Sequence, residues 1–220
     1  MEKILIRIGI FLLFSPNIVA QNSPVFFNDI ISKRNVVGLN FLFENSLYTG
    51  ISYDRIITVK EKNVNIGIEF GSPLYLISER NKRIAVNTGV YLLKSDYNIR
   101  TQVSISTNFY DDALSKGQFM DASVGIFPGY YRPKYFIASE ISYRNNLFTT
   151  FNFKDISPVQ GDLILANTTG SFNFGLNGGV FIKRRLELKS KLFYNMPRDF
   201  KNYPPFTQNI GFNLGVNYWF

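Results

Sequence analysis

The chain has 220 residues and a formal net charge of +8, and it contains neither cysteine nor histidine. The absence of cysteine excludes disulfides, and the absence of histidine excludes the usual Ser-based catalytic dyads and triads. Mean hydropathy is −0.02 although 22 Phe and 13 Tyr are present. No long apolar run follows residue 20, so the composition excludes membrane-spanning helices beyond that point and is typical of alternating, aromatic-rich strands.

Residues 1–20 predict a secretory signal peptide. Lys3 and Arg7 supply its positive end, residues 8–14 form its apolar core, and a small residue precedes the expected cleavage site. The apolar run is well short of the about 20 residues that a membrane-spanning helix needs. We therefore expect export through the Sec route, followed by a lead-in segment at 21–35 that stays in the periplasm or folds partly into the next domain.

The rest of the chain, residues 36–220, predicts a single all-β domain. Successive side chains of a strand point to opposite faces, and ten segments each place apolar residues on one face and Gly, Asn, Ser or charged residues on the other. In chain order the segments are 36–44, 47–57, 64–77, 83–93, 97–110, 119–131, 135–148, 170–182, 186–196 and 209–220.

Three positions depart from this regular pattern. Arg55 falls on an apolar face, which predicts a place near a membrane interface or a local register error. Pro73 predicts a bulge or an early strand end, because proline cannot donate to a sheet. The long connection 149–169 is too apolar for a plain loop, so it either extends the neighbouring strands beyond the membrane or folds over the mouth.

The lengths of the connections predict how the strands are arranged. After the fourth strand, short and longer connections alternate, as in an up-and-down barrel with short periplasmic turns and longer outer loops. We therefore expect a closed up-and-down antiparallel transmembrane β-barrel of about ten strands, with eight or twelve strands as alternatives. A soluble exported β-sandwich is a further alternative, although a sandwich gives no reason for this rhythm.

The last strand carries the most specific local pattern. Residues 209–220 alternate almost without interruption, and the chain ends on Phe220, with Tyr218 on the same apolar face. This ending resembles the C-terminal strand of bacterial outer-membrane β-barrels of the OmpA-like and OmpW-like kind. The resemblance implies insertion into the outer membrane by the barrel-assembly machinery, with Tyr218 and Phe220 as the assembly signal.

The face that would point into the barrel lumen carries charges of both signs, which predicts internal ion pairs because an unmatched charge is costly at low dielectric. Arg100, Asp121, Glu140 and Arg144 lie on three consecutive segments and are candidates for one network. The predicted set of lumen charges is Asp54, Glu69, Arg100, Asp121, Glu140, Arg144, Lys189 and Lys191, and Glu187 faces inward with them.

Two functional classes follow from these patterns. The first is a structural or interaction scaffold whose narrow lumen is largely filled by side chains. The second is a narrow channel for ions or small polar solutes, slightly anion-favouring through Lys189 and Lys191. Basic residues near the outer loops are candidate contacts to lipopolysaccharide phosphates, with solvated loop charge as the alternative. They are Arg80, Lys82, Arg83, Arg198 and Lys201.

Other roles are disfavoured by the residues present. No metal-ligand cluster and no pair of carboxylates at a useful spacing is found, so we expect neither an enzyme nor a cofactor. The expected partners are outer-membrane lipid and lipopolysaccharide, the barrel-assembly machinery and an envelope protein. Nucleic acid is not expected, because the basic residues lie mainly in short breaks between strands. These are Lys60, Lys62, Arg132, Lys134, Lys183, Arg184 and Arg185.

Overall fold

The structure is a computed structural model that describes most of the predicted domain. The described residues are 34–43, 47–60, 62–73, 82–93, 95–111, 115–153, 162–166, 170–182, 185–197 and 210–220. The expected signal peptide at 1–20 and nearly all of the lead-in at 21–35 lie outside these ranges. Within them, no helix has the length and apolar character to cross a membrane.

The described residues form eleven β-strands, ten of which close into a ring. The strands are β1 (Asn35–Phe43), β2 (Leu47–Val59), β3 (Lys62–Pro73), β4 (Lys82–Tyr91), β5 (Tyr97–Asp111), β6 (Ser115–Tyr131), β7 (Tyr135–Phe153), β8 (Asp162–Ala166), β9 (Ser171–Ile182), β10 (Leu186–Pro197) and β11 (Ile210–Trp219).

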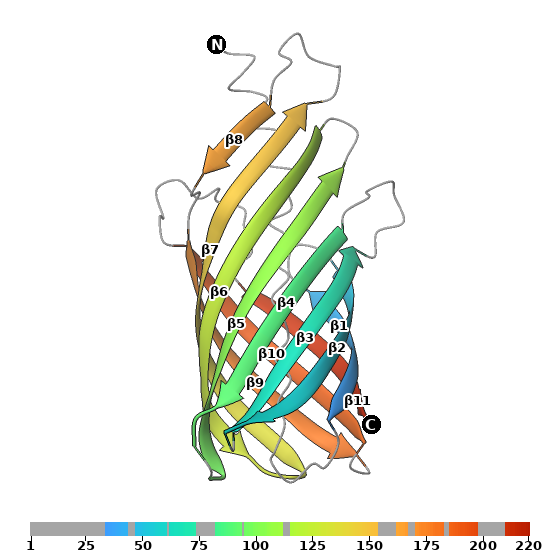
Figure 1. Ribbon diagram of the computed structural model, residues 1–220, viewed down its shortest axis with the longest axis vertical. Coiled ribbons are helices and arrows are strands. Elements are labelled where there is room, and N and C mark those ends of the chain that lie inside the picture. Colours follow the sequence, from blue (N-terminus) through green and yellow to red (C-terminus); the bar gives the residue numbers. More distant parts are fainter. Residues whose placement is uncertain are drawn as a thin grey trace.

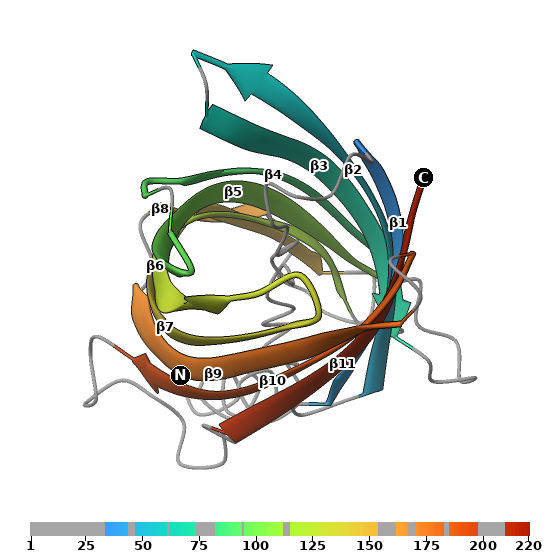
Figure 2. The same ribbon diagram turned by 90° about the horizontal axis from the view of Figure 1, so that it is seen from below.

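The ring closes where the first strand meets the last (Figures 1 and 2). β1 pairs antiparallel with β11 from Val36↔Trp219 to Phe43↔Phe212, and all other neighbours in the ring are antiparallel as well. The backbones of Asn35 and Phe220 exchange two hydrogen bonds of 3.1 and 2.9 Å. The predicted closed, up-and-down, ten-stranded barrel is confirmed, and closure leaves no strand edge in the ring exposed to hydrocarbon.

The burial of side chains is inverted relative to a soluble protein. On the outer face Val103, Ile137 and Phe212 are 49%, 51% and 37% exposed, whereas Asn65 and Asn217 inside the ring are fully buried. A sandwich would shield these apolar residues between its sheets. The faces predicted from the alternation are confirmed, and the β-sandwich alternative is wrong, because the sheet closes into a ring.

The barrel is taller on one side than on the other (Figure 1). β5, β6 and β7 contain 15, 17 and 19 residues, against 9 in β1 and 10 in β11. The short strand β8 pairs only with the far end of β7, from Phe148↔Ala166 to Asn152↔Asp162. Residues 149–153 therefore extend β7, as expected for the strand before this connection, and residues 162–166 add a further strand to it.

The sequence did not predict an irregularity between β6 and β7. Met120 pairs with Phe148 and Asp121 pairs with Asn146, so Leu147 is an extra residue on β7. Such a β-bulge exchanges the faces of all later residues. Consequently Phe148 shares the outward face of Met120, and Thr149 is buried inside the barrel.

The two ends of the barrel differ in their connections. We call the end where short connections join β2 to β3, β4 to β5, β6 to β7 and β9 to β10 the short-turn rim, and the opposite end the long-loop rim. Pro73 is the last described residue of β3, where it pairs with Tyr48, so no bulge interrupts the described part of this strand. Arg55 is exposed on the outer face and pairs with Asn35 and Ile66 near the short-turn rim, which agrees with the predicted place near an interface.

Candidate functional site: the filled lumen

Side chains rather than open space occupy much of the barrel interior. Among the described residues, four carboxylates and four cations are buried there, so the buried charge sums to zero. They are Asp54, Glu69, Glu140 and Glu187, with Arg83, Arg100, Lys189 and Lys191.

At the short-turn rim the lumen contains a cluster of buried side chains that we call the aromatic plug. Its members come from six strands and are at most 6% exposed, and Phe181 of β9 packs against them. Viewed from below, the hairpin that joins β6 and β7 lies across this end of the barrel (Figure 2). The plug consists of Val36, Ile56, Tyr91, Phe127, Tyr131, Phe136, Ala138 and Trp219.

The rings of the plug contact one another at favourable aromatic distances. Tyr131 meets Tyr91 edge-on at 5.1 Å between ring centroids and stacks on Phe136 at 6.2 Å. The Tyr131 hydroxyl donates to the backbone oxygen of Phe127 at 2.8 Å, so its polar atom is satisfied within the plug. Gly179 makes room for the Phe136 ring, because a Cβ atom there would lie 2.3 Å from Phe136 Cε1.

A chain of amides and charges lies next to the plug. Arg100 donates to Asn65 Oδ1 at 2.8 Å and to Gln102 Oε1 at 2.9 Å. Asn65 in turn donates to Asp54 Oδ1 and to Asn87 Oδ1, both at 3.1 Å. The Arg100 guanidinium also lies 5.8 Å from the Phe127 ring centroid, which joins the polar chain to the plug through a cation–π contact.

Glu187 joins the last strand to this polar layer. Its Oε2 accepts hydrogen bonds from the indole Nε1 of Trp219 at 3.0 Å and from the Asn217 amide at 2.9 Å. Lys189, two residues further along β10 on the same face, is buried, and its Nζ has no hydrogen-bond partner among the described residues.

Two buried ion pairs join strands that lie close together in the ring, one between the neighbours β3 and β4 and one between β7 and β10 on either side of β9. Lys191 Nζ of β10 lies 2.7 Å from Glu140 Oε2 of β7, and Ser142 and Asn177 donate to the same carboxylate at 2.9 and 3.2 Å. Arg83 Nη1 of β4 lies 3.4 Å from Glu69 Oε1 of β3. Both pairs are at least nine-tenths buried, and such pairs persist only with good geometry and further hydrogen bonds.

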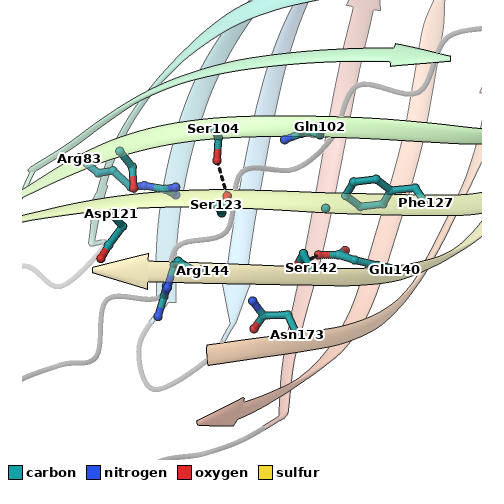
Figure 3. A pocket seen from close by; sticks show the side chains of 12 residues that line it. Arg83, Gln102, Ser104, Asp121, Ser123, Phe127, Glu140, Ser142, Arg144 and Asn173 are labelled. Atoms are coloured by element: carbon teal, nitrogen blue, oxygen red, sulfur yellow. Dashed lines mark hydrogen bonds between the residues drawn. The ribbon is translucent and has the colours of Figure 1, made fainter. Parts of the chain in front are cut away.

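A small cavity remains along the wall formed by β5, β6 and β7 (Figure 3). Its volume is about 40 Å³, which at about 10–15 Å³ for each water centre admits a few waters. Phe127 of the plug bounds it, and Asp121 and Arg144, both half-buried, line it together with Arg83 and several serines. Ser104 and Ser123 hydrogen-bond each other at 2.6 Å across this wall.

The predicted lumen residues all lie inside the barrel, but their partners differ from the expected network. The carboxylate of Asp121 accepts from the amides of Asn108 and Asn146. Glu140 is paired with Lys191 on the opposite side of β9, and Arg100 with amides of β3 and β5. The charges thus connect across several strands instead of along β5, β6 and β7. Sequence reasoning did not predict the role of Trp219, although it shares its inward face with Asn217.

The proposed outer contact at Arg83 is wrong. Arg83 is 3% exposed and faces inward against Glu69, because it has the same parity as Asn87 and Tyr91 along β4. Lys82 is exposed at the start of β4, and Arg80, Arg198 and Lys201 lie outside the described residues. The alternation of faces along β4 already predicts that Lys82 points outward and Arg83 inward.

The terminal aromatics lie on the outer face. Tyr218 and Phe220 are 44% and 49% exposed, and their rings stack at 6.2 Å between centroids. They lie at the short-turn rim beside Arg185, whose Nη1 is 3.5 Å from the Tyr218 hydroxyl.

Comparison with solved structures finds bacterial outer-membrane proteins. An outer-membrane channel from Pseudomonas putida F1 aligns over 91% of this chain and 100% of its own, with a TM-score of 0.53 and 8% identity. The outer-membrane protease OmpT from Escherichia coli aligns over 90% of this chain and 99% of its own, with a TM-score of 0.50 and 10% identity. No protein-family model matches the sequence, and no curated protein matches it. The likeness is one of fold: like these two proteins, this chain is a closed antiparallel β-barrel, and its outer face is apolar.

Proposed function

We propose that this protein is a structural or interaction scaffold of the outer membrane, with a lumen occupied by its own side chains. The observation that carries the proposal is the aromatic plug, which joins side chains of six strands at the short-turn rim. A polar layer with zero net buried charge lies behind it, and the adjoining cavity of about 40 Å³ is too small for a solute path. The extended wall of β5 to β8 then offers the surface for an envelope partner or for lipopolysaccharide.

A narrow channel is the second candidate, favoured by the polar cavity on the β5–β7 wall. Its serines and its half-buried Asp121 and Arg144 resemble the lining of a solute path. An anion preference through Lys191 has little support, because Glu140 pairs with it, whereas Lys189 is buried with an Nζ that has no hydrogen-bond partner among the described residues. Neither candidate requires catalysis or a cofactor.

For biogenesis we propose export through the Sec route by the signal peptide at 1–20, followed by insertion through the barrel-assembly machinery. The outward position of Tyr218 and Phe220 on the closing strand supports their role as the recognised signal. Deleting Phe220 is expected to reduce the outer-membrane yield strongly, whereas Phe43→Ala, which removes another exposed aromatic, is expected to leave it unchanged. An unchanged yield after deletion of Phe220 would contradict the proposed signal.

Planar-bilayer recording tests the scaffold against the channel. Purified, refolded barrel is added at neutral pH, and a known open porin serves as the positive control for insertion. Quantitative incorporation without a steady conductance level supports the filled lumen. A reproducible open level from the unmodified chain would overturn the scaffold proposal and establish the channel.

A further inference from the structure

The short-turn rim carries positive charge. Among the described residues of its connections, Lys60, Arg132, Lys134 and Arg185 are basic and Asp96 is acidic. Neither the plug nor the lumen charges use these residues.

One part of this rim adjoins a groove on the outer face. The groove has a volume of about 420 Å³ and runs over β3, β4 and β5 from the turn between β2 and β3. Lys60 and Lys62 line its end at the rim, and Val59, Val64, Val90 and Val103 line it further along. Val59 and Val103 are 48% and 49% exposed, so the groove opens toward the membrane and not toward the lumen.

The side chains of β4 explain the depression. Val64, Val90 and Thr101 lie in one row across the three strands, and the next row is Ile66, Thr88 and Val103. The middle residue of each row, Thr88 or Val90, is a short β-branched side chain, and no aromatic ring fills the space. The result is an apolar trough with two ammonium groups at its interfacial end.

We propose that this groove binds an anionic glycerophospholipid, with its phosphate at Lys60 and Lys62 and one acyl chain along the valines. The groove matches a phospholipid from headgroup to acyl chain, because its cations lie at the membrane interface and its apolar lining lies at the depth of the acyl chains. Lysine binds phosphate through a compact positive charge and charge-assisted hydrogen bonds. The site lies at the rim opposite the long loops, which distinguishes it from the candidate lipopolysaccharide contacts.

A second copy of the chain fits this surface less well. In a symmetric dimer the same patch contacts itself, so the lysines of both copies would be brought together. A neighbouring groove provides an internal comparison. It has a similar volume, about 430 Å³, but is lined by uncharged residues such as Leu93, Tyr97 and Ile137. The barrel thus has two apolar grooves of similar volume, and only the proposed site has lysines at one end.

Native mass spectrometry of the intact, detergent-solubilised barrel tests the proposal with dioleoylphosphatidylglycerol and dioleoylphosphatidylcholine as probes. The unmodified protein is expected to retain one phosphatidylglycerol preferentially. The variant K60Q/K62Q should bind it about 25-fold more weakly, since each of the two lysines near anionic headgroups contributes about fivefold. The matched control K82Q/K116Q removes two exposed lysines at the long-loop rim and should bind as the unmodified protein does.

A second variant tests the acyl-chain part of the site without changing charge. Val103→Trp places a larger apolar side chain in the groove, where exposure to lipid makes it compatible with folding. It is expected to weaken retention of phosphatidylglycerol although Lys60 and Lys62 remain. The proposal is overturned if K60Q/K62Q retains the lipid like the control, if phosphatidylcholine binds equally well, or if the unmodified protein is a dimer through this face.

Discussion

The two ends of the lumen are built from different chemistry. At the short-turn rim, aromatic and aliphatic side chains of six strands pack into the plug. Toward the long-loop rim, the wall formed by β5, β6 and β7 carries hydroxyls and amides around a cavity of about 40 Å³. Arg83 and Glu140, one member of each buried ion pair, line this cavity, and Phe127 of the plug lines it as well.

Different residues therefore narrow the lumen and make its wall polar: the plug does the first, and the strands β5 to β7 do the second. The polar wall resembles a channel lining, but it leads onto Phe127 and the rings behind it. Closure of the ring satisfies the hydrogen-bonding groups of the strand backbones, and lipid covers the outer face. The plug therefore does not need to supply most of the folding free energy. Its removal should therefore change permeation more than it changes the architecture.

The largest effect is expected from removing two rings of the plug. Phe127→Ala with Phe136→Ala deletes two buried side chains, and each deletion is expected to cost about 3–5 kcal/mol of folding free energy. The variant should show a conductance level in planar bilayers that the unmodified protein lacks. Tyr97→Ala serves as control, because Tyr97 is 72% exposed on the outer face. A folded double variant that stays silent would show that the polar layer alone closes the lumen.

The next effect concerns the ion pair between Glu140 and Lys191. Glu140→Ala removes the carboxylate that lies 2.7 Å from Lys191 Nζ, and loss of one member of a buried pair is expected to cost about 3–5 kcal/mol. The double variant E140M/K191M should regain most of this loss, since it removes both charges. Urea unfolding in detergent micelles measures the difference. Equal instability of single and double variants would show that the packing of Glu140, not its charge, matters.

A smaller effect is expected from Trp219→Phe. The change removes the indole donor to Glu187 Oε2, a bond of 3.0 Å in a fully buried position, and should cost about 1–3 kcal/mol. Tyr218→Phe is the matched control on the same strand, because its hydroxyl lies on the exposed outer face. If both substitutions shift the urea midpoint equally, the hydrogen bond from Trp219 to Glu187 does not contribute more to stability than the exposed Tyr218 hydroxyl does.

The alternation of side chains explains why the fold was predictable from the sequence. A two-residue period assigns each residue of a strand to the lipid or the lumen, and this held for residues as different as Phe212 and Asn217. The same parity assigned Arg83 to the lumen, but its place after a polar loop led to the wrong prediction of a surface contact. Local context was followed there although the period was the stronger constraint.

The contacts inside the barrel were not predictable in the same way. Parity gives the face of a residue, but not its height or the direction of its side chain. Glu140 and Lys191 meet only because β9 brings β7 and β10 to the same part of the ring. The bulge at Leu147 adds one residue without any proline or glycine beside it, so no local signal marked the exchange of faces.

The smallest effect is expected at the short-turn rim, from Asp96→Asn. Asp96 Oδ2 lies 2.8 Å from Arg132 Nη2, and both side chains are about half exposed at 45% and 48%. Exposed pairs contribute little and are screened by salt, so the urea midpoint should fall slightly at low salt and remain unchanged at high salt. Arg132 also donates to the Tyr130 hydroxyl at 2.5 Å and lies 5.0 Å from its ring centroid. Because these two contacts remain in Asp96→Asn, Arg132→Gln should shift the midpoint further, and the excess should persist at high salt.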